Sequence, residues 1–345
     1  MEKYRIKNLR IIVVLVITLL SCNGQSKRTT QKGQMPAFPS VYQSELTDGI
    51  VYFSKNGGLT WEDKSNGLPD KVTLGIGGLA VSGNSLGIAT KDDGIYLFNL
   101  QNQIWVQTPT DEEIIKNNLG TLSFFKNHFF VGTQLNGVYT TSNNGSNWNS
   151  LNTGLNNLTI RRLVPIGNKL YAGTNTGLYS LDNKLKSWKL EYGNNSLQVN
   201  GITEFNGNIY IGTNQGLFTN ANNQRGWKKM LDGYSLHNVS SDDKYIYAMT
   251  YNELLSSKDN GDNWKSVQRG LPKELYTFDI INNKNLVFAG QWDGVYRKDS
   301  ENDIWQSYSN GLPSDLAITN IKSYINFIVV SGNERGLRKG MTTDK

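Results

Sequence analysis

Four acidic side chains, Asp92 or Asp93 together with Asp293 or Glu334, are the candidates for acid–base chemistry in this 345-residue chain. Two carboxyl groups that face each other at about 5–10 Å can hydrolyse a glycosidic bond, one as the proton donor and the other as base or nucleophile. The residues around these acids form no recognisable catalytic phrase, and similar acids occur on many polar loop surfaces. The sequence therefore names no catalytic residue and leaves a carboxylate pair as an open alternative.

Five further side chains are suited to binding a ligand: Arg161, His237, Tyr251, Trp292 and Arg335. We expect them, like the acids above, in loops on one face of the fold. Trp292 stands out because it is the only tryptophan outside a regular series. A tryptophan at a turn tip can stack on a sugar or on a partner side chain, although packing onto the neighbouring loop explains it equally well. We predict a ligand-binding surface made of these five residues together with Asp92, Asp293 and Glu334.

Metal ions and cofactors are not expected. The chain has two histidines, His128 and His237, and one cysteine, Cys22, and these show no spacing typical of zinc ligands. A single cysteine also forms no internal disulfide. A domain of about 300 residues can bury a core large enough to do without one.

The element that must position these side chains is a repeat. Seven tryptophans recur at intervals of 37 to 44 residues: Trp61, Trp105, Trp148, Trp188, Trp227, Trp264 and Trp305. A period of roughly 40 residues with strand-like segments indicates the blades of a β-propeller. In the third complete copy, segments 160–165, 170–174, 178–181 and 187–190 read as four short antiparallel strands separated by turn residues.

The number of blades follows from both chain ends. Six copies contain all four strands, starting near Val72, Leu119, Ile160, Val199, His237 and Tyr276. Segments 318–323 and 327–331 supply two strands at the carboxy end, and 49–54 with Trp61 supply the other two. Pairing the chain ends makes a seventh blade and leaves no exposed sheet edge. Spare strand material at 41–44 and 336–338 keeps eight blades as the alternative.

Turns before several of the tryptophans share a pattern. It reads Ser54-Lys55-Asn56-Gly57-Gly58-Leu59-Thr60-Trp61, Thr141-Ser142-Asn143-Asn144-Gly145-Ser146-Asn147-Trp148 and Ser257-Lys258-Asp259-Asn260-Gly261-Asp262-Asn263-Trp264. These turns resemble the Asp-box, or bacterial neuraminidase repeat. Its residues are structural: the acid or amide accepts turn hydrogen bonds, glycine adopts a positive φ, and tryptophan is buried between sheets.

The resemblance covers residues 41 to 340 and includes sialidases. Sialidases hold a carboxylate with three arginines, the first in an Arg-Ile-Pro phrase near the start of the domain. Here no arginine occurs between Arg28 and Arg161, so we do not expect a sialidase. The chain is more similar to exported Asp-box propellers that resemble the photosystem II assembly factor. That resemblance implies a non-catalytic binding or assembly module for a protein or a glycan, with a glycoside hydrolase as the alternative.

The amino terminus predicts export. Four basic residues precede an apolar run at 11–20 that is too short to span a bilayer but suits a secretory signal. The run ends in Leu19-Leu20-Ser21-Cys22, which resembles a bacterial lipobox; a plain signal peptide or an uncleaved anchor is the alternative. The resemblance implies cleavage after residue 21 and lipidation of Cys22, and acyl chains then anchor the protein to a membrane. We predict a signal peptide at 1–21, a flexible tether at 22–39 and a propeller at 40–345.

Charge speaks against nucleic acid as a partner. The net charge of +6 comes from the signal peptide and the tether, since residues 35–345 carry 28 basic and 28 acidic side chains. A nucleic-acid partner requires a one-sided basic surface, which a neutral domain does not indicate. The start at Cys22 resembles lipoproteins of the Bacteroidetes, in which acids after the cysteine favour surface export. Because this tether is basic, we expect the periplasmic side of the outer membrane.

Overall fold

The computed structural model describes residues 49–334 except 71, 221–225, 273–276 and 300–301. All described residues belong to one compact unit, Ser44–Lys345. The predicted signal peptide, the tether, Cys22 and Arg335 lie outside the described residues, as does the side chain of Glu334. Within the described part of the chain, no helix is long and apolar enough to cross a membrane.

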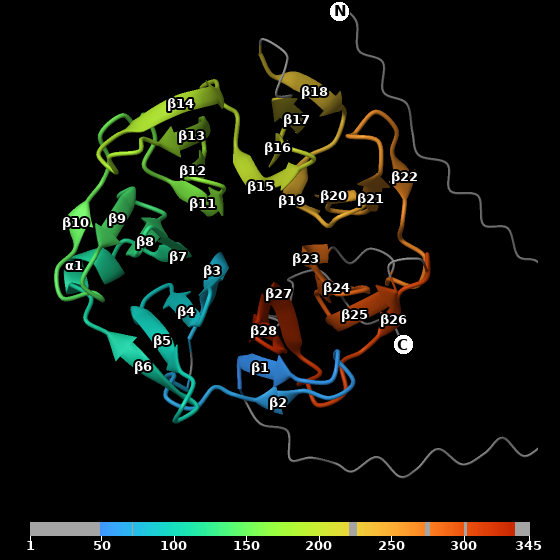
Figure 1. Cartoon of the computed structure of the whole chain (residues 1–345), viewed down its shortest axis with the longest axis horizontal. Coiled ribbons are helices and arrows are strands. Elements are labelled where there is room, and N and C mark those ends of the chain that lie inside the picture. Colours follow the sequence, from blue (N-terminus) through green and yellow to red (C-terminus); the bar gives the residue numbers. More distant parts are fainter. Residues whose placement is uncertain (1–48, 71, 221–225, 273–276, 300–301, 335–345) are drawn as a thin grey trace, which may run out of the picture. The chain divides into compact units, whose positions relative to one another are not determined.

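Seven four-stranded antiparallel sheets form a ring, which confirms the predicted seven-bladed propeller (Figure 1). Each blade is given from its innermost to its outermost strand. Blade 1 is β3 (Leu74–Ser82), β4 (Ser85–Thr90), β5 (Ile95–Asn99) and β6 (Ile104–Thr108); blade 2 is β7 (Leu119–Phe125), β8 (His128–Thr133), β9 (Val138–Thr141) and β10 (Asn149–Ser150); blade 3 is β11 (Ile160–Ile166), β12 (Lys169–Thr174), β13 (Gly177–Leu181) and β14 (Trp188–Gly193); blade 4 is β15 (Val199–Phe205), β16 (Asn208–Thr213), β17 (Gly216–Asn220) and β18 (Lys228–Leu231). Blade 5 is β19 (Leu236–Ser241), β20 (Ile246–Thr250), β21 (Leu254–Ser257) and β22 (Lys265–Ser266); blade 6 is β23 (Thr277–Asn283), β24 (Leu286–Gln291), β25 (Gly294–Asp299) and β26 (Gln306–Ser307); blade 7 is β27 (Leu316–Tyr324), β28 (Phe327–Glu334), β1 (Val51–Ser54) and β2 (Glu62–Asp63). One short helix, α1 (Glu112–Ile115), precedes blade 2.

Blade 7 joins the two ends of the described chain. Strand β1 pairs with β28 in antiparallel register, with Val51 opposite Ser331 and Phe53 opposite Val329. The hydrogen bonds between β1 and β28 close the ring, which removes the free strand edges that an open sheet would expose. The spare segments 41–44 and 336–338 lie outside the described residues.

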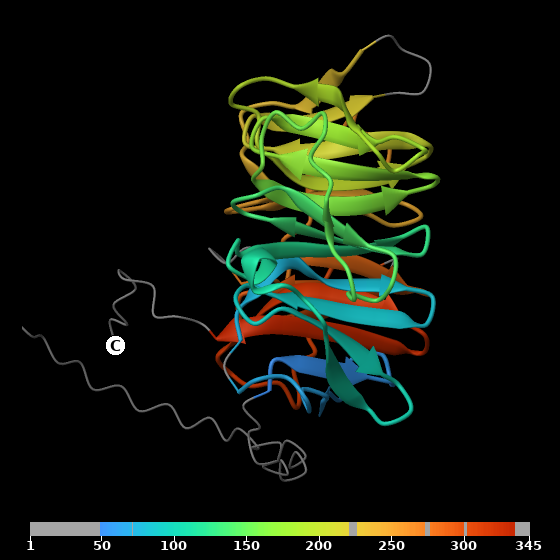
Figure 2. The same ribbon diagram turned by 90° about the vertical axis from the view of Figure 1, so that its left-hand side faces the viewer.

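The two faces of the ring carry different turns. In the side view of the ring, the strands run from one face to the other (Figure 2). The crossings between blades and the turns between second and third strands form one face, the loop face. The turns that resemble Asp-boxes and the turns between first and second strands form the other, the Asp-box face. In one such turn, Asp259 Oδ1 accepts hydrogen bonds from Ser257 Oγ at 2.7 Å and from the Asn263 N–H at 2.9 Å.

The core lies between adjacent sheets. Second strands are buried on both sides, as the residues of β12 show, whereas the outermost strand β14 is largely exposed. The second strand of blade 3 and the inner strand of blade 4 approach so closely that a methyl group at Gly173 would lie 2.7 Å from the Val199 carbonyl oxygen. A glycine at this position therefore lets the two blades pack closely.

Tryptophans tie successive blades together. The indole N–H of Trp305 in blade 6 donates to the Val267 carbonyl, which follows blade 5, at 2.8 Å. The backbone N–H of Trp305 also donates to the Arg269 carbonyl at 3.0 Å. Gly270, at a φ of 91°, packs on the same residue, and a methyl group there would lie 2.1 Å from the Trp305 oxygen. Trp61, Trp105 and Trp188 repeat both backbone contacts with the blade before them.

Candidate functional site

Bulges at the start of the inner strands build the candidate site. All seven inner strands lose register with their second strand near the loop face, and each skips at least one residue. In six strands the skipped residues are Gly120, Arg161, Asn200, His237, Phe278 and Thr319, and in β3 the irregularity extends from Leu74 to Leu79. A bulge re-aims a side chain at the rim of a sheet. The six skipped residues all line one cleft at the centre of the loop face.

This cleft, which we call the rim cleft, has a volume of about 720 Å³. Its aromatic lining is His237, Tyr251, Phe278 and Trp292, and its cations are Lys91, Arg161 and Arg162. Amides and hydroxyls from Thr73, Asn118, Gln134, Asn200, Thr319 and Asn333 line it as well, with Leu74, Gly75, Ile76, Leu119, Gly120 and Ala317 completing the wall. Among these described lining residues there is no carboxylate, so the rim cleft is a cationic site.

Aromatic rings form one side of the rim cleft, over blades 5 and 6. The Trp292 ring stacks on Phe278 with centroids 5.9 Å apart and an interplanar angle of 26°. The His237 ring lies 5.3 Å from Tyr251 and 6.5 Å from Phe278. Tyr251 remains 53% exposed and Trp292 is half-buried. Together these rings present a largely preformed apolar surface to solvent.

Arg161 is held on the facing side by two amides. Its Nε donates to Asn200 Oδ1 at 2.5 Å, and its Nη1 donates to Asn175 Oδ1 at 2.9 Å. Burial lowers the pKa of the Arg161 guanidinium, and the neighbouring Tyr251 opposes that shift. Because Asn200 and Asn175 are neutral amides, they orient the guanidinium of Arg161 without neutralising its charge.

His237 spans two blades. Its Nε2 lies 2.5 Å from the Thr277 carbonyl oxygen on the next inner strand. Burial lowers the pKa of His237 to about 4, with the Arg162 charge acting in the same direction. The imidazole is therefore neutral at pH 7, and Nε2 must carry the proton to donate to that carbonyl.

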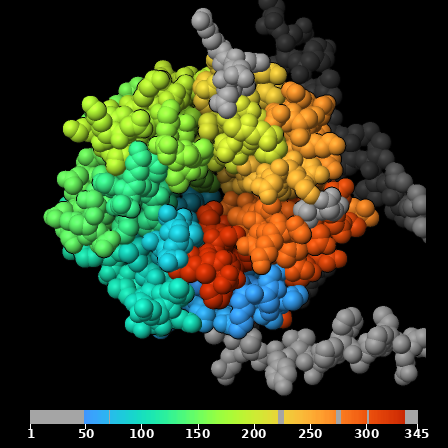
Figure 3. Space-filling model, in the orientation of Figure 1, coloured from blue at the N-terminus to red at the C-terminus, as the bar shows by residue number. Residues whose placement is uncertain are grey.

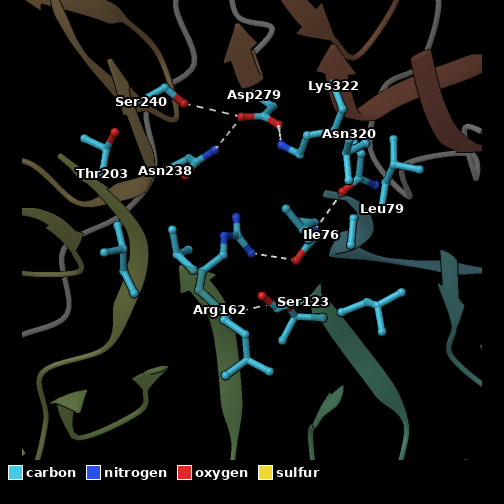
Figure 4. A pocket seen from close by; sticks show the side chains of 18 of the residues that line it. Ile76, Leu79, Ser123, Arg162, Thr203, Asn238, Ser240, Asp279, Asn320 and Lys322 are labelled. Atoms are coloured by element: carbon cyan, nitrogen blue, oxygen red, sulfur yellow. Dashed lines mark hydrogen bonds and ion pairs between the residues drawn. The ribbon is translucent and has the colours of Figure 1, made fainter. Parts of the chain in front are cut away.

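Below the rim cleft the inner strands enclose a second cavity of about 310 Å³, which we call the throat. The space-filling view of Figure 3 shows a hollow at the centre of the ring. In Figure 4 the Arg162 side chain reaches into the throat, where Nη1 donates to the Ile76 carbonyl at 2.6 Å. Asp279 pairs with Lys322 at 2.8 Å and accepts a hydrogen bond from Ser240 at 3.3 Å. Arg162 and Ile76 line both the rim cleft and the throat, so the two cavities adjoin.

The sequence-predicted residues divide into two groups. The structure brings Arg161, His237, Tyr251 and Trp292 together in the rim cleft. Asp92 is exposed in the turn after β4 and does not line the cleft. Asp293 is also outside the lining, and its Oδ2 accepts the Tyr296 hydroxyl at 2.9 Å.

For Trp292 we expected either stacking on a ligand or packing onto a neighbouring loop. Its ring packs on Phe278, at the start of the inner strand of the same blade. Phe278, Asn200 and Lys91 also line the cleft but were not predicted from the sequence. Asn200 and Phe278 share a position, since each directly follows the first residue of an inner strand. A bulge leaves no clear mark in a strand sequence, and this signal is readable only once the blades are aligned.

The arrangement supports binding more directly than proton transfer. Within the described residues, no group of three or more His, Cys, Asp or Glu side chains is placed to hold a metal ion. Arg162 keeps its charge at neutral pH, because burial lowers its pKa only to about 10. The side chains of the rim cleft can stack on a ligand, make apolar contacts with it and donate hydrogen bonds to an anionic group.

The described strands form a seven-bladed β-propeller that is similar in fold to YCF48. No protein-family model and no curated protein sequence matches the chain. Solved structures match in fold. YCF48 bound to D1 peptide superposes with a TM-score of 0.61 at 13% identity, over 76% of this chain and 93% of that one.

Two larger proteins contain a similar propeller. The extracellular domain of a candidate one-component system, BT4673 from B. thetaiotaomicron, gives a TM-score of 0.61 at 15% identity over 78% of this chain and 38% of that one. The GH74 xyloglucanase from Xanthomonas campestris gives 0.58 at 16% identity over 81% and 54%. At these identities the likeness establishes the fold alone.

Proposed function

We propose that the chain is a non-catalytic binding module whose loop face holds an extended segment of a partner protein. The observation that carries this proposal is the composition of the rim cleft. Aromatic rings face three cations, and no described lining residue is a carboxylate. Such a surface favours a segment that combines apolar or aromatic side chains with acidic ones.

The physical reason lies in how such contacts contribute to affinity. Tryptophan, tyrosine and arginine dominate binding energy at protein interfaces, because they bury large areas and lose little entropy when preordered. Trp292 is preordered by Phe278, and Arg161 is preordered by Asn200 and Asn175. The YCF48 structure was determined with a D1 peptide, which supports a protein segment as the ligand of this propeller.

The hydrolase alternative has less support from the geometry. Hydrolysis of a glycosidic bond requires two carboxyl groups across the bond. Asp92 and Asp293 do not line the rim cleft, and Asp293 accepts a hydrogen bond from Tyr296. A glycan ligand without hydrolysis would use the Trp292 ring and would not require the arginine charge, so the two ligand classes are separable by experiment.

We also propose that the protein is a lipoprotein of the bacterial cell envelope, anchored through Cys22 at the periplasmic side of the outer membrane. The lipobox-like segment at 19–22 and the basic tether support this assignment. In that setting the tether would place the propeller near the membrane, where it could hold an envelope protein.

An array of immobilised peptides and polysaccharides tests the binding proposal. The purified protein should be retained by peptides that carry acidic and aromatic residues, and retention should fall as salt is raised, because the contacts include exposed charges. Peptides with the acids replaced by amides are the matched control. Retention by neutral polysaccharides instead of peptides, or release of reducing sugar, would overturn the proposal.

A further inference from the structure

We propose that the throat binds a small oxyanion, a carboxylate or inorganic phosphate, through Arg162 and the hydroxyl groups of Thr121 and Ser123. This site lies below the rim cleft and does not depend on the peptide-binding role proposed for that cleft. Three features of the throat carry the inference: the charge that remains after ion pairing, an unsatisfied buried hydroxyl, and the convergence of donors on one space.

Charge pairing leaves one cation over. Lys322 is paired with Asp279 at 2.8 Å, and Asp279 also accepts hydrogen bonds from Ser240 and Asn238 (Figure 4). Arg162 forms no ion pair with a described carboxylate, and its two hydrogen bonds are from Nη1 to the carbonyl oxygens of Ile76 and Arg161. The charged side chains that line the throat are two cations, Arg162 and Lys322, and one carboxylate, Asp279, so its described lining has a net positive charge that a monoanion would match.

Ser123 supplies the second feature. It lies on β7, lines the throat and is 3% exposed. Its Oγ is buried and has no hydrogen-bond partner among the described residues. An unsatisfied buried hydroxyl is costly, and it is explained if the hydroxyl donates to a bound group.

The donors converge. A methyl group built at Gly77 would lie 3.1 Å from Thr121 Oγ1 and 3.6 Å from Arg162 Cδ, so these two residues border the same space. Thr121 Oγ1 accepts from the Leu163 N–H at 3.3 Å, which leaves its own proton available to donate. Ser123 lies two residues further along β7, so three donors from β7 and β11 line one side of the throat, whose volume of about 310 Å³ can hold a small ligand.

Melting of the full chain in acetate, phosphate or chloride at equal ionic strength tests the proposal. Either oxyanion should raise the melting temperature more than chloride does, and the more effective one identifies the group as carboxylate or phosphate. Titration with that anion should show an affinity lower by about tenfold or more in Arg162→Gln. Lys284→Gln, which removes one exposed positive charge on the Asp-box face, should bind like the wild type.

Ser123→Ala keeps the proposal testable if Arg162→Gln does not fold. Because the hydroxyl has no partner in the folded chain, its removal should leave the melting temperature without oxyanion unchanged or raised. The same change should weaken oxyanion binding by about three- to tenfold. Equal shifts in all three salts, or unchanged binding in Ser123→Ala, would overturn the throat site. Arg162 also lines the rim cleft, whereas Ser123 lines the throat alone. Peptide retention should therefore be unchanged in Ser123→Ala, which separates this result from the proposed function.

Discussion

Asn200 and His237 occupy the same bulge position in successive blades and make the same contact with the blade that follows. Asn200 Nδ2 donates to the Leu236 carbonyl at 2.7 Å, and His237 Nε2 lies 2.5 Å from the Thr277 carbonyl. One residue is an amide and the other a neutral imidazole, yet each links inner strands around the rim. The rim cleft is therefore lined by side chains that also hold the ring together.

This equivalence predicts a pH dependence that one substitution should remove. The pKa of His237 is about 4 in the folded chain and near 6.5 when unfolded, so only the unfolded chain gains a proton between these values. The free energy of unfolding should therefore be highest above about pH 6.5, and it should fall by at most about 3 kcal/mol as the pH drops toward 4. Urea unfolding at several pH values measures this. His237→Asn, which copies Asn200, should lose that part of the slope; an unchanged slope would contradict the assignment.

Tryptophans of the repeat should not be equivalent in stability. Trp305 is 2% exposed and donates to the preceding blade, whereas Trp264 is half-buried and its indole N–H donates to Gly261 in its own turn. Trp305→Ala should lower the free energy of unfolding by about 3–5 kcal/mol, the range for emptying a large buried aromatic site. Trp264→Ala should cost clearly less in the same denaturant titration. Equal losses would mean that the contact with the preceding blade contributes little.

The turn at Asp259 should tolerate an amide but not a methyl group. Hydrogen bonds from the Asn263 side chain and backbone, then from Ser257, lower the pKa of Asp259 to about 2. Asn143 accepts the same bonds from Thr141 Oγ1 and the Asn147 N–H without a charge. Asp259→Asn should therefore melt near the wild-type temperature at pH 7, and Asp259→Ala lower. The contribution of the charge is present above the unfolded pKa and is lost as the pH falls toward 2. A melting temperature of Asp259→Ala equal to that of Asp259→Asn would show that these bonds are dispensable.

Most of the fold was predictable because the same pattern of strands and turns recurs in successive copies of the repeat. The inner strands begin within two residues of the positions predicted, and the closure of β1 on β28 followed from counting strands at the two ends. Gly270 can be recognised in the sequence as a turn residue, because it stands in a Gly-Leu-Pro segment after the outermost strand. Their second role was not, because the contact of Gly270 with Trp305 joins residues 35 apart in the sequence and depends on how two sheets meet.

The site was less predictable for a different reason. Loop topology placed Arg161, His237, Tyr251 and Trp292 on one face, and they do meet there. Phe278 and Asn200 were missed because strand alternation would turn each side chain toward a neighbouring sheet, and a bulge reverses that direction. Arg162 was not placed in the throat for the same reason, since two successive residues of one strand do not normally face the same cavity.

Lipidation of Cys22 can be tested by metabolic labelling. We expect the protein expressed in a bacterial host to incorporate labelled palmitate, because Cys22 follows a lipobox-like segment and is the chain's single cysteine. Cys22→Ala should abolish the label and release the protein from the membrane fraction. Equal labelling of both proteins would show that the acyl chains are attached elsewhere, and no labelling of either would show that the segment is a plain signal peptide or an uncleaved anchor.

Trp292 provides the sharpest test of the rim cleft. Trp292→Ala should weaken retention of an acidic–aromatic peptide by roughly 1–3 kcal/mol, the scale for removing an aromatic anchor from an interface. Folding should change little, because the ring is half-buried and its stacking on Phe278 is worth only about 0.5–1.5 kcal/mol. Leu59→Ala is the control, since Leu59 is 55% exposed and lies in a turn of the opposite face. Arg161→Gln should weaken retention as well and reduce its salt dependence. If Leu59→Ala weakens retention while Trp292→Ala does not, the binding surface is the Asp-box face.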